Sequence, residues 1–227
     1  MTQPLQPLFD SNRRWAAETE ARSPGFFTRL MQQQRPQYLW IGCADSRVPA
    51  NQIVGLLPGE LFVHRNVANV VVHSDLNCLS VVEFATGVLG VEHVMVVGHY
   101  GCSGVKAAMT NTRMGLADNW LRHVQDVHEK HLDWLSCIGD GTIRHQALCE
   151  LNVLEQVLNL GRTTVIQDAW ARGQQLMLHG WVYGLHNGLV NDLQMSVADP
   201  ETMAQTHRAA VEALKRRYAE AVVPEAA

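Results

Sequence analysis

YLWIGCADSR, residues 38–47, joins a short apolar run to a cysteine and two charged residues. VMVVGHYGC, residues 94–102, repeats this arrangement with a histidine and a second cysteine. Both runs are partly β-branched and stop at a glycine, which is typical of buried parallel strands. Ligands of open α/β sheets gather at the carboxyl ends of strands, so we expect the two polar segments to meet in one crevice.

Together the two segments supply three metal-ligating side chains, those of Cys43, His99 and Cys102. Thiolate and imidazole ligands suit a tetrahedral, borderline-soft cation, which makes zinc the expected metal. A buried cysteine is also a common small apolar residue; the coincidence of two ligand-bearing segments, each after a strand-like run, favours the metal. Structural zinc sites are closed by four protein ligands, whereas three ligands are typical of a catalytic site.

C-A-D-S-R at residues 43–47 and H-Y-G-C at residues 99–102 resemble the β-class carbonic anhydrases, over a match from about Trp15 to about Asp192. The resemblance implies one Zn²⁺ per subunit, held by the two cysteines and the histidine, with Asp45 and Arg47 as a hydrogen-bonded pair beside it. The implied activity is the reversible hydration of carbon dioxide to bicarbonate and a proton. Two thiolates cancel the zinc charge and weaken the Lewis acid, so we expect a preference for alkaline pH.

A further resemblance concerns family members that bicarbonate inhibits. Their signature residues match Trp40, Arg65 and Tyr183. The implied pocket would offer a cation and hydrogen-bond donors to the anion. It implies an open state and a closed state in which Asp45 becomes the fourth zinc ligand, with low pH and high bicarbonate favouring the closed one. The alternative is that Trp40 and Tyr183 only pack in the core and that Arg65 pairs with a carboxylate.

Two residues are implied to contact substrate. Gln34 matches a glutamine that donates a hydrogen bond to substrate in the family, although three consecutive glutamines, residues 32–34, leave its register open. Phe84 matches an aromatic residue that reaches the pocket of a neighbouring subunit, and ordinary helix core is its alternative. The family also implies a homodimer or homotetramer, embraced by the N-terminal helices.

Two alternative functions use the same zinc ligands. Hydrolysis of carbonyl sulfide or carbon disulfide would need only different access to the pocket. A non-catalytic zinc and bicarbonate sensor would keep Asp45 permanently on the metal. Gln34 and the Asp45–Arg47 pair favour catalysis, because a permanently closed site needs no donor directed at substrate.

Composition excludes several other classes. The chain has 227 residues, 47% of them hydrophobic, and a net charge of −4, which gives no basic footprint for nucleic acid. The run at residues 215–217 is interpreted as a solvated helix face. No apolar stretch approaches the roughly 18 residues that a membrane span needs.

The N-terminus carries no basic start or apolar centre of a secretory signal, so we expect a cytoplasmic location. Cys78, Cys137 and Cys149 have no obvious partners and are interpreted as buried filler in a reducing compartment. The last feature is a group of three histidines, interpreted as ordinary helix surface: His123, His128 and His131.

Strand and helix patterns alternate along the chain and predict a parallel α/β fold. Strands are expected at residues 38–42, 61–65, 94–98 and 163–169, with an edge strand at 176–183 turning into 189–194. Helices are expected at residues 8–21, 26–34, 76–89, 116–137, 146–160 and 204–219. The predicted fold is therefore a central, mostly parallel β-sheet flanked by helices, with an antiparallel edge strand. We predict one domain, residues 1–227, comprising an N-terminal helical arm (1–35), an α/β core (36–195) and a C-terminal helix and tail (196–227).

Overall fold

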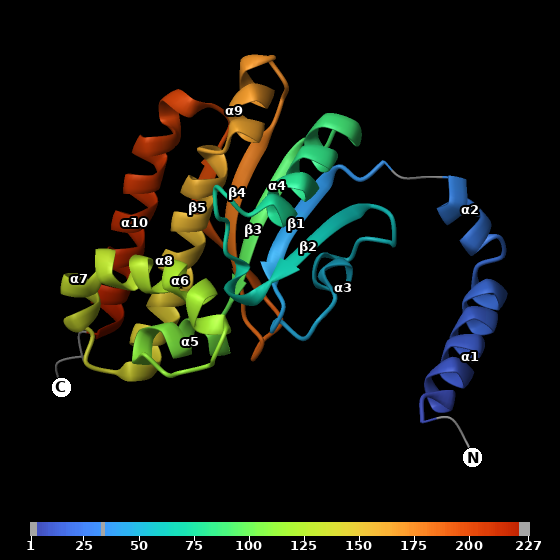
Figure 1. Ribbon diagram of the computed structural model, residues 1–227, viewed down its shortest axis with the longest axis horizontal. Coiled ribbons are helices and arrows are strands. Elements are labelled where there is room, and N and C mark those ends of the chain that lie inside the picture. Colours follow the sequence, from blue (N-terminus) through green and yellow to red (C-terminus); the bar gives the residue numbers. More distant parts are fainter. Residues whose placement is uncertain (1–3, 33–34, 223–227) are drawn as a thin grey trace. The chain divides into compact units, whose positions relative to one another are not determined.

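The computed structural model describes residues 4–32 and 35–222, with the side chains described as far as residue 219 (Figure 1). The chain divides into two compact units, Met1–Arg35 and Pro36–Ala227.

The first unit is a pair of helices, α1 (Gln6–Arg22) and α2 (Phe26–Gln32). Proline in the first turn suits the start of α1, because its missing N–H needs no partner there. The two helices are separated by a turn in which Gly25 has a φ of 76°, a conformation that glycine adopts without strain. Trp15 and Phe27 pack edge to face, with ring centroids 5.6 Å apart. Both predicted helices of the arm are thus present.

The second unit contains a five-stranded sheet in the order β2-β1-β3-β4-β5. Its strands are β1 (Tyr38–Cys43), β2 (Leu61–Asn66), β3 (His93–His99), β4 (Met177–Tyr183) and β5 (Val190–Val197). The first four run parallel and β5 is antiparallel to β4. This confirms the predicted fold class, because the parallel strands are linked through helices and β1 lies between β2 and β3.

Two predictions about this sheet are wrong. Residues 163–169 form not a strand but the start of α9 (Thr164–Ala171), because Thr163 caps a helix: its Oγ1 accepts a hydrogen bond from the N–H of Ile166 at 3.5 Å. β4 is not the edge strand, since it lies between β3 and β5. The antiparallel edge is β5, and the turn at 184–188 joins the two strands.

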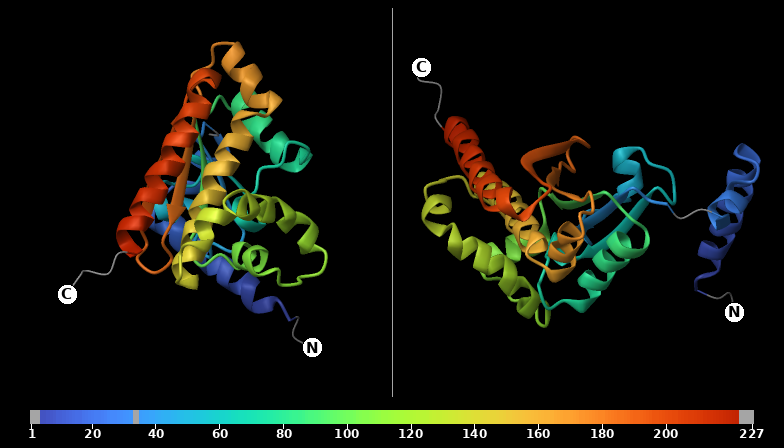
Figure 2. Two further views of the ribbon diagram at one scale, coloured as in Figure 1. Left: turned by 90° about the vertical axis from the view of Figure 1, so that its left-hand side faces the viewer. Right: turned by 90° about the horizontal axis from the view of Figure 1, so that it is seen from above.

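Helices α8 (Gly141–Gly161) and α10 (Pro200–Val222) pack against one face of the sheet (Figure 2). Besides α9, the second unit also contains α3 (Ala50–Val54), α4 (Leu76–Glu83), α5 (Ser103–Thr110), α6 (Ala117–Lys130) and α7 (Leu132–Ser136). A 3₁₀ turn occupies Val67–Asn69, and α4 continues into a π-helical turn at Phe84–Val88. No helix in the described part of the chain is both long and apolar enough to cross a bilayer.

The helix predicted at residues 116–137 is in fact broken at His131, whose φ of −111° interrupts the regular backbone between α6 and α7. His131 is buried, so its assignment to the helix surface is wrong. Its Nε2 donates to Glu155 Oε1 at 2.9 Å, and His207 Nε2 donates to the same oxygen at 3.1 Å. Lys130 Nζ donates to Glu155 Oε2 at 2.7 Å. One buried carboxylate of α8 therefore ties α6 and α10 to the centre of the unit.

The three cysteines outside the two motifs differ in burial. Cys78 and Cys149 are buried, which agrees with their interpretation as apolar filler. Cys137 is exposed, so the same interpretation is wrong for it. It directly follows α7, and its thiol donates to the carbonyl of Asp133 at 3.3 Å, a contact within the last turn that needs no buried setting.

Candidate active site

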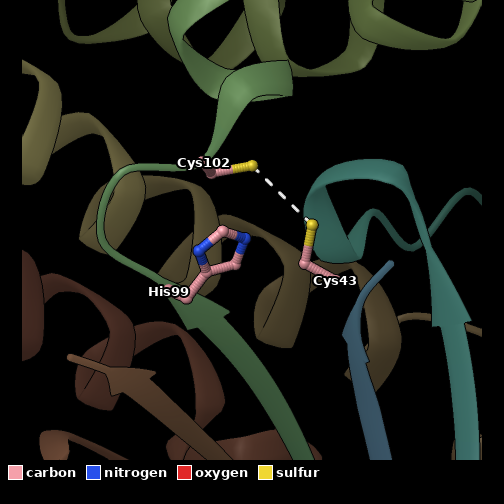
Figure 3. Close-up of side chains that lie close together, drawn as sticks. All are labelled: Cys43, His99 and Cys102. Atoms are coloured by element: carbon pink, nitrogen blue, oxygen red, sulfur yellow. Dashed lines mark hydrogen bonds between the residues drawn. The ribbon is translucent and has the colours of Figure 1, made fainter. Parts of the chain in front are cut away.

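The three predicted metal ligands lie together at the carboxyl ends of neighbouring parallel strands. Cys43 ends β1, His99 ends β3, and Cys102 directly precedes α5 (Figure 3). All three are buried, and one ligand atom from each lies within 4.8 Å of the others. Asp45 is not a member of this group. These three residues form a Cys–His–Cys group at the strand ends where the two sequence segments were expected to meet.

The geometry of this group fits zinc. The Sγ atoms of Cys43 and Cys102 are 3.7 Å apart. Two sulfurs that each lie about 2.3 Å from a tetrahedral zinc are separated by about 3.8 Å. His99 Nδ1 donates a hydrogen bond to the carbonyl of Tyr100 at 3.0 Å, which leaves the lone pair on Nε2. Nε2 is buried and has no hydrogen-bond partner, as expected of a ligand atom that faces a metal.

The sulfur of Cys43 also receives two backbone N–H groups. The N–H of Asp45 and the N–H of Ala68 each lie 3.3 Å from Sγ. The hydrogen bond from Cys102 lowers the pKa of the Cys43 thiol, burial opposes this, and His99 and the Asp45 N–H add to the lowering. Of these contacts, the two backbone N–H groups also remain when Cys102 is deprotonated, and they stabilise the Cys43 thiolate, which is the form that binds metal.

Helix α8 contacts the surroundings of every ligand, which sequence analysis missed. His145 Nε2 donates to the carbonyl of Cys102 at 3.0 Å, and Asn152 Nδ2 donates to the carbonyl of Ala68 at 2.8 Å. Glu150 accepts a hydrogen bond from the hydroxyl of Tyr100 at 2.6 Å. Polar residues inside an otherwise apolar helix were the available signal, because buried polar groups need partners.

Glu150 also joins the C-terminal helix to this region. Its Oε1 accepts a hydrogen bond from the Tyr218 hydroxyl at 2.8 Å, and its Oε2 pairs with Arg217. Arg217 is part of the basic run at residues 215–217, so that run is not simply a solvated helix face. The carbonyl of Tyr100 accepts a hydrogen bond from His99, and the hydroxyl of Tyr100 donates one to Glu150. The Glu150 carboxylate therefore connects α10 to His99 through Tyr100.

Asp45 and Arg47 closely follow Cys43 in the chain, and Asp45 contacts Ser103, the residue after Cys102. Arg47 has a φ of 62°, and its Nη2 lies 3.6 Å from Asp45 Oδ1, which makes the two an ion pair and not the expected hydrogen-bonded pair. Asp45 Oδ2 accepts hydrogen bonds from the Ser103 N–H at 3.1 Å and from its hydroxyl at 2.9 Å. Burial raises the pKa of Asp45, but hydrogen bonds from Ser103 and the charges of His99 and Arg47 outweigh it, so the pKa is lowered overall. Sequence analysis had not identified Ser103.

Trp40, Arg65 and Tyr183 lie on the same face of the sheet, opposite α8. Trp40 and Tyr183 belong to one hydrophobic cluster with Leu61 of β2. Arg65 lies four residues after Leu61 in that strand, so alternation places it on the same face. Its Nη2 donates to the carbonyl of Val48, a residue that packs against this cluster.

Of the two residues implied to contact substrate, the structure describes Phe84 but not Gln34. Phe84 is 43% exposed and begins the π-helical turn, where its ring stacks on Phe62 with centroids 5.8 Å apart. It is therefore not ordinary helix core. Gln34 lies outside the described residues.

The structure brings a second group of ligand-type side chains together: His64, Asp75 and Cys78. Asn66 Nδ2 lies 3.3 Å from His64 Nε2, and because an amide nitrogen only donates, Nε2 accepts with its lone pair. Burial raises the pKa of the Cys78 thiol to about 12, and the Asp75 charge adds to this. A lone pair already in use and a thiol held protonated indicate a structural cluster.

Comparison with known proteins decides the family. The family model described as carbonic anhydrase matches residues 38–190. A Coccomyxa β-carbonic anhydrase, solved with acetazolamide, superposes with a TM-score of 0.84 at 36% identity, covering 98% of this chain and 100% of that one. The chain belongs to the β-class carbonic anhydrases. Carbonic anhydrase is thus its enzyme class, as the two motifs predicted.

Fungal carbonic anhydrases are also similar to the chain. A carbonic anhydrase of Emericella nidulans is 46% identical over 188 residues, which cover 83% of this chain and 82% of that protein. A Sordaria macrospora β-carbonic anhydrase, described as tetrameric, has a TM-score of 0.80 at 35% identity and covers 86% of this chain and 98% of its own.

Proposed function

We propose that this carbonic anhydrase is zinc-dependent, with Cys43, His99 and Cys102 holding one Zn²⁺ per subunit. The observation that carries the proposal is the unpartnered, buried Nε2 of His99 beside two sulfurs at tetrahedral spacing. When bound there, zinc would lower the pKa of a coordinated water and so supply a nucleophile for carbon dioxide.

The second part of the proposal is that Asp45 orients this water. Ser103 occupies Oδ2 with two hydrogen bonds, so Oδ1 is the oxygen left to accept one from the water. The guanidinium of Arg47, 3.6 Å from Oδ1, favours the ionised carboxylate. Gln34 is proposed as the donor to substrate, because a neutral amide suits the oxygens of carbon dioxide and bicarbonate.

Inhibition by bicarbonate is the regulatory part of the proposal. Trp40, Arg65 and Tyr183 supply an indole, a cation and a hydroxyl on one face of the sheet. Arg65 donates one hydrogen bond to the carbonyl of Val48, and its guanidinium has further N–H groups that could donate to an anion. Bicarbonate would favour a state in which Asp45 joins the metal. In the described structure Asp45 lies outside the ligand group, as the open state of the proposed pair would require.

We further propose a homodimer or homotetramer. The Sordaria protein supports this by its tetrameric description. In the N-terminal arm, Leu8, Phe9 and Trp15 are each more than half exposed, and apolar side chains in such numbers favour a protein partner. Phe84 is then proposed to reach a neighbouring subunit's pocket. Light scattering should give a mass of two or four chains of 25.3 kDa.

A cytoplasmic location completes the proposal. Its support is the set of free thiols outside the proposed zinc site, Cys78, Cys137 and Cys149, which fit a reducing compartment. Cell fractionation with an antibody against the chain tests it.

The decisive experiment is stopped-flow hydration of carbon dioxide by zinc-loaded protein from neutral to alkaline pH. Each pH is measured with added bicarbonate and with chloride at equal ionic strength. We expect activity that rises with pH and is suppressed by bicarbonate alone. Activity that bicarbonate does not suppress would refute the proposed regulatory pocket and would still support the enzymatic function. With full zinc and no activity at any pH, carbonyl sulfide and carbon disulfide would be assayed next.

A further inference from the structure

The turn after β2 holds an unusual backbone conformation next to the metal site. Ala68 has a φ of 64° and a ψ of 24°, and Asn69 has a φ of 47°. Residues with a Cβ disfavour this left-handed region, so two in succession need support from their surroundings. The conformation has one visible consequence, because it directs the N–H of Ala68 at Cys43 Sγ, 3.3 Å away.

Helix α8 supplies that support through two amide side chains. Asn152 Nδ2 donates to the carbonyl of Ala68 at 2.8 Å, and Asn152 Oδ1 accepts from Gln156 Nε2 at 3.0 Å. Gln156 Oε1 in turn accepts the N–H of Val71 at 2.8 Å. Asn152 and Gln156 are both fully buried. Because no water competes for these groups, their geometry is strongly determined.

We propose that Asn152 is a positioning residue for the Cys43 thiolate. Its hydrogen bond to the Ala68 carbonyl holds the turn so that the Ala68 N–H donates to the sulfur. A hydrogen bond to a thiolate withdraws electron density that the sulfur would otherwise give to the metal. With two thiolates on one zinc, this withdrawal preserves part of the Lewis acidity that the thiolates remove. The inference rests on the zinc site proposed above.

Cobalt substitution tests it, because Co²⁺ bound to thiolate has a charge-transfer band whose energy reports on the sulfur. In Asn152→Leu the amide is lost while side-chain volume is largely kept, and the Ala68 N–H is free to leave the sulfur. We expect the band of the cobalt-loaded variant to move to lower energy. Asn159→Leu is the matched control, since Asn159 donates to Gln156 and Val71 in the same network but not to Ala68. Its band should coincide with that of the wild type.

A rescue variant separates positioning from general loosening of the core. Glycine adopts a positive φ without strain, so adding Ala68→Gly to Asn152→Leu should let the turn keep its conformation and should return the band toward the wild-type energy. Should Asn152→Leu fail to fold, Asn152→Ala replaces it, since alanine adds no apolar volume beside the turn.

The outcomes are distinguishable. If wild-type protein loaded with Co²⁺ lacks the charge-transfer band, the proposed thiolate ligands are wrong and the inference falls with them. If the wild type has the band and Asn152→Leu leaves it unchanged, or Asn159→Leu moves it equally, the positioning role alone is overturned. A band that moves in Asn152→Leu and returns in the double variant supports the role.

Discussion

The sulfurs of Cys43 and Cys102 lie 3.7 Å apart although 59 positions separate the two residues in the chain. The sheet produces this proximity, because β1 and β3 are neighbours in parallel register and end at the same edge. The distance is too long for a disulfide and matches two thiolates on one tetrahedral ion.

Replacing one of these sulfurs should therefore weaken zinc binding. For Cys102→Ser we expect less than stoichiometric zinc by elemental analysis and a fall in carbon dioxide hydration of more than about 100-fold, since even changes outside the ligand set cost 10- to 100-fold. Cys137→Ser is the control, because Cys137 is exposed and lies outside the ligand group. Full zinc content in Cys102→Ser would refute the ligand assignment.

Asp45→Asn should keep the metal and lose the reaction. The amide preserves the shape of the side chain but removes the charge that orients water, so we expect kcat to fall by about 100-fold or more. Ser103→Ala is the matched variant: Asp45 keeps the Ser103 N–H and loses only the hydroxyl at 2.9 Å, so a smaller loss is expected. Equal zinc content must be shown for all three proteins. Wild-type kcat in Asp45→Asn would remove Asp45 from the mechanism.

Tyr183→Phe tests the bicarbonate pocket with the smallest change available. It deletes one hydroxyl from a buried ring, and we expect the bicarbonate concentration needed for half inhibition to rise by about tenfold, the effect of one lost hydrogen bond to a charged group. Trp40→Phe should likewise flatten the inhibition. Trp181→Phe is the control, because Trp181 packs edge to face on Trp40 at 6.5 Å and shares its surroundings. Inhibition unchanged in Tyr183→Phe and Trp40→Phe would exclude this pocket.

Glu155→Gln should reveal a stability term that depends on pH. Burial alone would raise the pKa of Glu155, but hydrogen bonds from His131, His207 and Lys130 outweigh it and hold the pKa well below its ordinary value. The ionised carboxylate thus stabilises the native state above the unfolded-state pKa of about 4.3, and this contribution is lost as pH falls below it toward the lower native value. At pH 7 we expect the substitution to cost about 3 kcal/mol, because it removes one partner of a buried ionic cluster.

Urea unfolding of wild type and Glu155→Gln at pH 7 and at pH 3 measures this term. The difference in unfolding free energy should shrink at the lower pH. Glu129→Gln, an exposed acid of α6, provides the baseline and should change little at either pH. A wild-type advantage of the same size at both pH values would contradict the ionic explanation.

The strands that carry the ligands could be predicted because their signals are local. Residues 38–43 and 93–99 are short apolar runs stopped by polar segments, and both are buried on both faces. Residues 163–169 misled for an equally local reason: Thr163, Thr164, Val165 and Ile166 are β-branched, yet the first of them caps a helix whose buried side comprises Ile166 and Ala169.

What the sequence could not show are relationships between distant elements. His131 has the setting of a surface histidine until Glu155, 24 residues later, is placed against it by the packing of α8. Asn152 and Gln156 occur within a helix-like run, and nothing local tells which backbone groups they contact 84 and 85 residues earlier. β4 could not be distinguished from an edge strand, because its place depends on where β5 returns.

The shared carboxylate of Glu150 links the C-terminal helix to the surroundings of His99. Arg217 and Tyr218 lie near the end of α10, and their contacts with Glu150 continue through the Tyr100 hydroxyl to the residue whose carbonyl accepts from His99. A chain trimmed to residue 216 would keep Cys43, His99 and Cys102 but would lose the contacts of Arg217 and Tyr218 with Glu150. We therefore expect changes to the C-terminal helix to affect metal retention as well as stability, so a preparation with low zinc should be checked first for an intact C-terminal helix.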